Sequence, residues 1–274
     1  MNRHLLVLFA CVLFAAQSVV ASAATLLTVD FNDRTAGTGG GVSNTQAGFS
    51  SWKMGGTTAA SSALESQAVG AYNVTLQAFD DGLDENNVQT GIQNTTGQID
   101  DRLRTTPANA GALTFADLYD DVIFAGASTG PTGGLDMTVS GGSLQPNTQY
   151  LVSVYAFDSG STPAPQPRTA NWLDGNNADA LVAATSFNGT VLPTANDTYK
   201  FTGIAITDAT GKLLLHARDT TPYTTPGGGA TVGVVVNGFE VAEVPEPASV
   251  ALFVAGAAIL NFVGRRKHRP YVTN

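Results

Sequence analysis

The sequence predicts an all-β ectodomain, a jelly roll or β-sandwich of about nine or more strands, between an N-terminal signal peptide and one C-terminal transmembrane helix. Three observations support this fold class. The apolar residues of the middle region come in short bursts, and several bursts alternate apolar and polar residues with a period of two. Turn-forming residues separate the bursts, among them many of the 30 glycines. Regularly spaced short strands of this kind are typical of sandwiches and jelly rolls.

Residues 1–23 are expected to be a secretory signal peptide. Arg3 supplies a fixed positive charge, an apolar run follows from Leu5 to Ala16, and Ala21-Ser22-Ala23 has the small-x-small pattern of a cleavage site. A buried N-terminal helix is the alternative. The single cysteine, Cys11, lies in this segment. The mature chain is therefore expected to have no disulfide, no cysteine-ligated zinc and no thiol nucleophile.

Residues 24–243 are expected to form the ectodomain. Of the chain's 13 basic and 22 acidic residues, eight and 21 fall in this region, which leaves a net charge of −13. Such an acidic surface repels the phosphate backbone, so nucleic-acid binding is excluded.

The clearest strand pattern is at Tyr72, Val74, Leu76 and Ala78, which alternate with polar residues. Asp208-Ala209-Thr210-Gly211 fits a type I turn and predicts a hairpin between the strands on either side. Short helices are predicted over residues 59–69 and from Thr114. The expected strands cover residues 25–31, 72–78, 121–125, 135–139, 150–157, 180–187, 199–207, 212–218 and 231–241.

Residues 244–274 combine three unlike elements in a fixed order. Pro245-Glu246-Pro247 predicts an extended junction, because each proline lacks an N–H and has a restricted φ angle. An apolar stretch follows, and a helix from Ala248 to Gly264 would be about 25 Å long, slightly short of a hydrocarbon core. Arg265 and Arg266 then begin a basic cluster, which is expected to stay in the cytoplasm.

This order of Pro-Glu-Pro, helix and arginines resembles the PEP-CTERM sorting signal of Gram-negative bacteria. The resemblance implies recognition by an exosortase-type membrane protease, anchoring in the inner membrane before processing, and delivery to the cell surface or extracellular matrix. An ordinary retained tail anchor is the alternative.

The second half of the ectodomain resembles galactose-binding-like jelly-roll modules. The resemblance rests on the strand from Tyr150 to Phe157, Lys200-Phe201-Thr202-Gly203, the Asp-Ala-Thr-Gly turn and Asn237-Gly238-Phe239-Glu240-Val241. Residues 144–150 are also similar to the corner of a fibronectin type III domain, which makes that sandwich the structural alternative.

No catalytic constellation is predicted. Gly126-Ala127-Ser128-Thr129-Gly130 has the G-x-S-x-G form of a nucleophile elbow, but Pro131 and two glycines stand where the elbow requires a helix. His216 is the only histidine of the ectodomain and lies in an apolar strand, where a packed or surface histidine is usual.

Asp80, Asp81 and Asp84 crowd one predicted loop and are candidate oxygen ligands for calcium. Turns are rich in the same residues, so a plain loop is the alternative. No other cofactor is predicted.

The polar segment between Asp158 and Asn177 is the most site-like part of the sequence. An aromatic ring with guanidinium, carboxylate and amide groups is a combination that holds sugars. In the alternative, the tryptophan packs onto the sandwich and the arginine pairs with a neighbouring aspartate. The candidate ligand-binding residues are Asp158, Arg168, Asn171, Trp172 and Asp174.

Together these observations predict an exported, noncatalytic surface or matrix protein that acts as a weak carbohydrate-binding or scaffold module, with extracellular polysaccharide as a partner. A polysaccharide-active enzyme, a glycoside hydrolase or lyase, is the alternative, because the many carboxylates allow an acid pair.

Overall fold

The computed structural model describes residues 23–32, 44–53, 64–79, 98–104, 106–107, 111–126, 134–160, 168–220 and 234–245. The strands belong to one compact unit, Thr25–Glu243. The described residues contain no helix, which confirms the all-β class. Accordingly, this part of the chain includes no helical span of sufficient length and apolarity to cross a bilayer.

Fourteen strands follow one another in the described part of the chain, against the nine or so that the sequence predicts. They are β1 (Thr25–Asn32), β2 (Ser50–Lys53), β3 (Leu64–Val69), β4 (Tyr72–Phe79), β5 (Gln98–Leu103), β6 (Asp121–Gly126), β7 (Gly134–Gly141), β8 (Gln149–Tyr155), β9 (Arg168–Asp174), β10 (Ala180–Phe187), β11 (Lys200–Ile206), β12 (Leu213–Asp219), β13 (Val234–Val236) and β14 (Gly238–Glu243).

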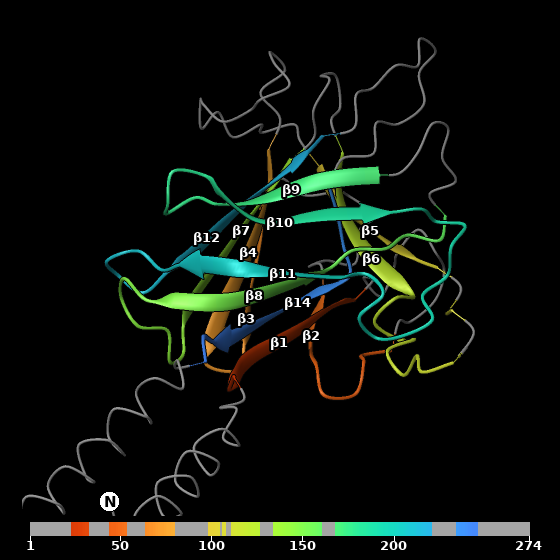
Figure 1. The fold of residues 1–274 in the computed structure, drawn as a ribbon, viewed down its shortest axis with the longest axis horizontal. Coiled ribbons are helices and arrows are strands. Elements are labelled where there is room, and N and C mark those ends of the chain that lie inside the picture. Colours follow the sequence, from red (N-terminus) through yellow and green to blue (C-terminus); the bar gives the residue numbers. More distant parts are fainter. Residues whose placement is uncertain are drawn as a thin grey trace, which may run out of the picture. The chain divides into compact units, whose positions relative to one another are not determined.

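The strands form two large sheets and a small one (Figure 1). The five-stranded sheet has the order β11-β8-β14-β1-β2, and the six-stranded sheet has the order β10-β9-β12-β7-β4-β3. The third sheet has the order β13-β6-β5. Among the strand pairs of the described residues, β1 and β2 are parallel and the others are antiparallel.

The main core lies between the two large sheets. Val29 and Phe31 of β1 and Val152 of β8 point into it from one sheet, and Met137 of β7 and Leu215 of β12 point into it from the other. These side chains alternate along each strand with outward residues, as the pleat requires. The period-two pattern of the sequence therefore reflects a sandwich-like packing of two sheets.

Edge strands β10 and β11 of the two large sheets approach closely at Gly203. A Cβ atom at this position would lie 1.6 Å from the carbonyl oxygen of Val182. Only a residue without a side chain fits such a contact, so Gly203 sets how closely the two edges can meet.

The structure corrects two expectations about local structure and one about connectivity. Residues 64–69, predicted as part of a helix, form β3, and in place of the helix predicted from Thr114 the chain is irregular at residues 114–115 and forms a turn at residues 116–119. The Asp208–Gly211 turn exists, with the Gly211 N–H donating to the Asp208 carbonyl at 3.1 Å. However, β11 and β12 belong to different sheets, so the turn connects the sheets and is not a hairpin.

Candidate functional site

The outer face of the five-stranded sheet is the face turned away from the main core. The pairing register of β1, β14, β8 and β11 places a row of polar side chains across this face. Thr28 of β1 lies opposite Glu240 of β14. Glu240 lies opposite Ser153 of β8, and Ser153 lies opposite Thr202 of β11. The Ser153 and Thr202 hydroxyl oxygens are 2.8 Å apart. A line of hydroxyl and carboxylate groups thus crosses the sheet, and within it Ser153 is buried, with 3% of its surface exposed.

A charged pair with an aromatic ring adjoins this row. Lys200 forms an ion pair with Glu240, and its Nζ lies 5.4 Å from the centre of the Tyr155 ring. The Tyr155 hydroxyl donates to Oε1 of Glu240 at 2.8 Å. Burial first, and the nearby Glu240 charge second, raise the pKa of Tyr155, so the phenol stays protonated and remains a donor. The two charged side chains are part exposed, at 30% and 19%.

Two partly buried phenylalanines border the polar row. The Phe49 and Phe115 rings meet edge to face with centroids 5.3 Å apart, and both contact Tyr155 at 5.8 and 6.2 Å. Asn196 holds the segment that carries Phe115, because its Oδ1 accepts from the N–H groups of Thr114 and Phe115 at 2.7 and 3.0 Å. The rings therefore have fixed positions beside the ion pair.

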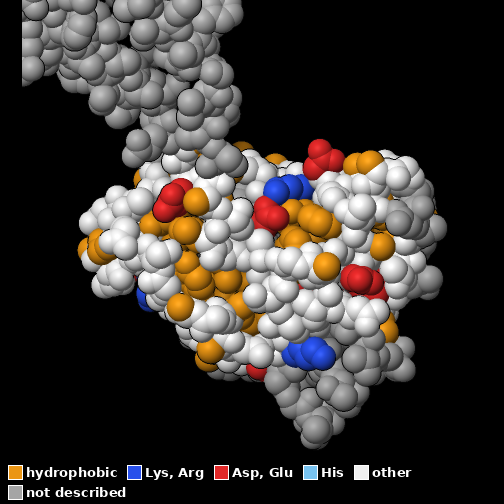
Figure 2. Space-filling model, turned by 90° about the horizontal axis from the view of Figure 1, so that it is seen from below, with side chains coloured by type: hydrophobic (Ala, Val, Ile, Leu, Met, Phe, Trp, Pro, Cys, Tyr) orange, Lys and Arg blue, Asp and Glu red, His pale blue; other side chains and the backbone are white. Residues whose placement is uncertain are grey.

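Apolar residues border the polar row on its other side. Ala242 lies opposite Leu151, and Leu151 lies opposite Ile204, whose side chain is 47% exposed. Figure 2, seen from below the view of Figure 1, shows hydrophobic side chains gathered in patches on a face with few charged side chains. A surface that alternates apolar patches with hydroxyl groups is suited to a ligand of mixed polarity.

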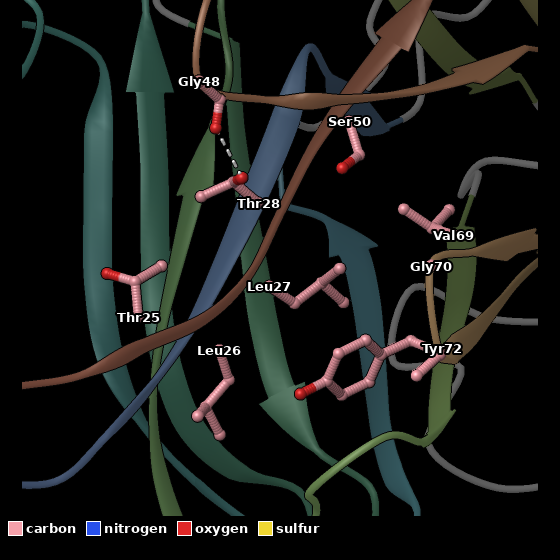
Figure 3. Close-up of a pocket in the computed structure, with 10 residues that line it drawn as sticks. Thr25, Leu26, Leu27, Thr28, Gly48, Ser50, Val69, Gly70 and Tyr72 are labelled. Carbon is pink, nitrogen blue, oxygen red and sulfur yellow. Dashed lines mark hydrogen bonds between the residues drawn. The ribbon is translucent and has the colours of Figure 1, made fainter.

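A hollow of about 500 Å³ opens where β1 enters the sheet (Figure 3). Leu27, Val69 and Tyr72 supply an apolar wall, and Thr25 and Ser50 supply hydroxyl groups. Thr28 lines the hollow as well, so the hollow adjoins the end of the polar row.

Trp172 does not form the sugar-stacking platform that the sequence suggested. It belongs to β9, not to a loop, and its side chain is 0% exposed in the main core. Asp174 is also buried: its carboxylate accepts from the N–H groups of Asn176 and Ile206 at 3.0 and 2.8 Å. Both side chains therefore serve the fold, because neither can reach a ligand in solvent.

Asp158 pairs with an arginine that the sequence did not single out. Arg104 contacts its two carboxylate oxygens at 2.6 and 3.1 Å, in a bidentate pair. Burial lowers the pKa of Arg168, and the charges of Asp158 and Asp219 oppose this shift. Asn171 alternates with its buried neighbours on β9 and lies opposite Arg218 of β12. The five predicted residues thus do not converge on one ligand.

The remaining sequence predictions fall partly outside the described residues. Asp80, Asp81 and Asp84 lie outside them, as do residues 127–130 of the G-x-S-x-G pattern. Pro245 is described, whereas the other sorting-motif residues, Glu246, Pro247, Arg265 and Arg266, are not. Within the described ranges, no three acidic or histidine side chains are grouped to hold a metal.

His216 lies in β12, and its Nδ1 is 2.7 Å from Oδ1 of Asp179. Asp179 has a positive φ of 55°, and Ala178 before it has 49°. The histidine therefore helps to hold a backbone turn that non-glycine residues rarely adopt.

Two buried carboxyl groups, those of Asp30 and Asp120, have raised pKa values. Asp30 is 0% exposed, and burial chiefly raises its pKa to about 7, while a hydrogen bond from the Gln46 N–H opposes the shift. Burial likewise raises the pKa of Asp120 to about 6. Neither group is among the described residues that line the hollow.

Comparison with known proteins gives no family. No protein-family model matches the chain, and no curated protein is similar to it. A search of solved structures finds the enzymatically active domain of tailspike protein 4 of bacteriophage CBA120, with 8% identity and a TM-score of 0.23. That match covers 63% of this chain, and the chain spans 18% of the tailspike chain.

Proposed function

We propose that this protein is an exported, noncatalytic surface or matrix module with a jelly-roll ectodomain that binds carbohydrate weakly through the outer face of the five-stranded sheet. The observation that carries the proposal is the arrangement of Phe49 and Phe115 beside the Lys200–Glu240 pair and the hydroxyl row.

Sugar rings present apolar C–H faces and polar hydroxyl edges, and the outer face offers partners for both. The phenylalanine rings provide apolar contact, which is worth about 1 kcal/mol for each ring. Lys200 donates hydrogen bonds and Glu240 accepts them, so the pair can contact neighbouring hydroxyl groups of a sugar. A few such contacts on a partly exposed face favour weak binding by one copy.

Many copies at a surface would supply the strength that one copy lacks. The sorting signal at residues 244–274 supports this arrangement, since it would bring copies to the same membrane and then to the cell surface. Linked or clustered weak sites bind a repeating polymer far more tightly than one site does. The proposed partners are therefore an extracellular polysaccharide and, during export, an exosortase-type protease.

A glycan array probed with the purified full-length protein, with and without Ca²⁺, tests the function. Phe115→Ala is expected to weaken glycan retention about tenfold, because loss of one ring contact together with its packing removes about 1.4 kcal/mol. Lys200→Gln should weaken it as well, whereas Lys212→Gln, in the exposed turn between β11 and β12, should not.

Circular dichroism and thermal melting check that each variant is folded. Retention that is equal for the wild type and for both outer-face variants would exclude this face as the site. Release of reducing sugar from a bound polysaccharide would instead favour the enzymatic alternative.

A further inference from the structure

We infer that the hollow beside β1 is a subsite for one uncharged sugar ring, at the end of a glycan chain that lies along the outer face. This inference rests on the proposed function and adds to it the substrate class, a neutral glycan. It draws on the charge of the hollow, the position of the Tyr72 ring and the connection to the polar row.

The hollow is uncharged in a strongly acidic protein. None of the described residues that line it carries a charge, although the region from residue 24 to 243 has 21 acidic side chains. A charged ligand group would lose its hydration here without meeting a counter-charge, which is unfavourable. The hollow therefore favours a neutral sugar over a uronate or an amino sugar.

Tyr72 is held in position before any ligand binds. Its hydroxyl oxygen lies 3.0 Å from Oγ of Ser143, on the turn after β7. Gly142 lies against the ring, since a Cβ at this glycine would come within 2.2 Å of the ring atoms Cε1 and Cζ. The ring also packs against the core. A preset aromatic wall costs little conformational entropy when a sugar ring contacts it.

The hydroxyl groups around the hollow match the polar edge of a sugar. Thr25 and Ser50 each carry a hydroxyl group at its lining, and Figure 3 shows the Tyr72 ring on the same side as Leu26 and Leu27. Thr28 donates to the Gly48 carbonyl at 2.8 Å, which leaves its oxygen free to accept another bond. At about 500 Å³, the hollow lies toward the lower end of the size range of small-ligand sites.

The hollow connects to the rest of the proposed site through Thr28. This residue lines the hollow and also begins the polar row opposite Glu240. A glycan that places its terminal ring in the hollow can therefore continue over Glu240 toward Thr202. Binding should then depend on a free, neutral chain end.

Isothermal titration of the full-length protein with three hexasaccharides tests the inference: cellohexaose, xylohexaose and the uronate hexamer of galacturonic acid. Ala71→Trp fills the mouth of the hollow from an exposed turn position and should weaken the binding of a neutral hexasaccharide about tenfold, as the loss of one ring subsite implies. Ala209→Trp, in the exposed turn between β11 and β12, is the matched control and should leave affinity unchanged.

Tyr72→Phe keeps the ring and should retain most of the affinity, whereas Tyr72→Ala should behave like Ala71→Trp. If Ala71→Trp leaves the affinity unchanged while Phe115→Ala still reduces it, the subsite is refuted and the proposed function stands. Tighter binding of the uronate than of both neutral hexamers would also refute the neutral subsite. If no hexamer binds below about 1 mM, the subsite is refuted, and if the glycan array retains no glycan either, both proposals fail. Binding of an uncharged Thr-Val hexapeptide that Ala71→Trp abolishes would assign the hollow to polypeptide.

Discussion

At the scale of single residues, Asp30 links the environment of one carboxyl group to the stability of the domain. Its side chain is buried on the outer side of β1, beneath the segment that contains Gln46. Its folded pKa of about 7 lies above the ordinary value of 3.8, so folding favours the protonated form. The associated stability is fully present below pH 4 and is lost as the pH rises through 7.

Asp30→Asn should therefore flatten the dependence of stability on pH between pH 4 and 7. A tenfold difference in proton affinity between the folded and unfolded states corresponds to about 1.4 kcal/mol, so the wild type should lose at most about 4 kcal/mol over this range from Asp30. The asparagine variant keeps an uncharged side chain and should lose less. Urea unfolding at pH 4.5, 6 and 7.5 measures the difference.

Asp208→Asn serves as a control, because the pKa of Asp208 is shifted in the opposite direction to that of Asp30. Hydrogen bonds from the Lys212 N–H and from Thr210 lower the pKa of Asp208, so its contribution is present above pH 4 and is lost in acid. This variant should change the free energy of unfolding at acidic pH. It should leave the decrease of that free energy toward pH 7 unchanged. An unchanged slope in Asp30→Asn would show that Asp30 is not the titrating group.

At the scale of elements, the meeting of β10 and β11 depends on one glycine. The β-carbon of an alanine at position 203 would overlap the backbone carbonyl of Val182, which cannot move aside as a flexible side chain can. Gly203→Ala is expected to separate the two edges and to lower the free energy of unfolding by about 1 to 3 kcal/mol, as overpacking does.

The denaturation midpoint in urea measures this effect. Ile204→Ala, on the next residue of the same strand, is the matched control, because its side chain is 47% exposed and should change stability by only about 0.5 kcal/mol. A Gly203→Ala variant as stable as the wild type would mean that the two edges are free to move apart.

At the scale of the whole molecule, the proposed signals at the two ends of the chain are expected to decide where the domain acts. If Pro245-Glu246-Pro247 and the arginines are read by a protease, changing Pro245 and Pro247 to alanine should leave a membrane-bound form that keeps its C-terminal peptides. The wild type should lose those peptides on processing. Mass spectrometry of cell-surface and membrane fractions compares the two forms.

The N-terminus of both forms should be Ala24, which controls for normal export. Equal recovery of C-terminal peptides from the wild type and the double variant would mean that the segment is an anchor and not a processing signal.

The sequence by itself determined the all-β class and the position of most strands, because the period-two alternation of apolar residues is a local property of each strand. The strands that it missed are short or polar. In β9, for example, the alternation of Ala170, Trp172 and Asp174 is present but lies within a segment rich in polar residues. A search for alternation that counts aspartate as an inward residue would have found it.

Only the tertiary structure decided which residues meet. The row from Thr28 through Glu240 to Thr202 and the pairing of Arg104 with Asp158 join residues far apart in the chain. Register and packing against the opposite sheet set such contacts, and neither is encoded in a short window of sequence. For the same reason the sequence could place Trp172 either at a ligand or in the core, and the packing of the two sheets placed it in the core.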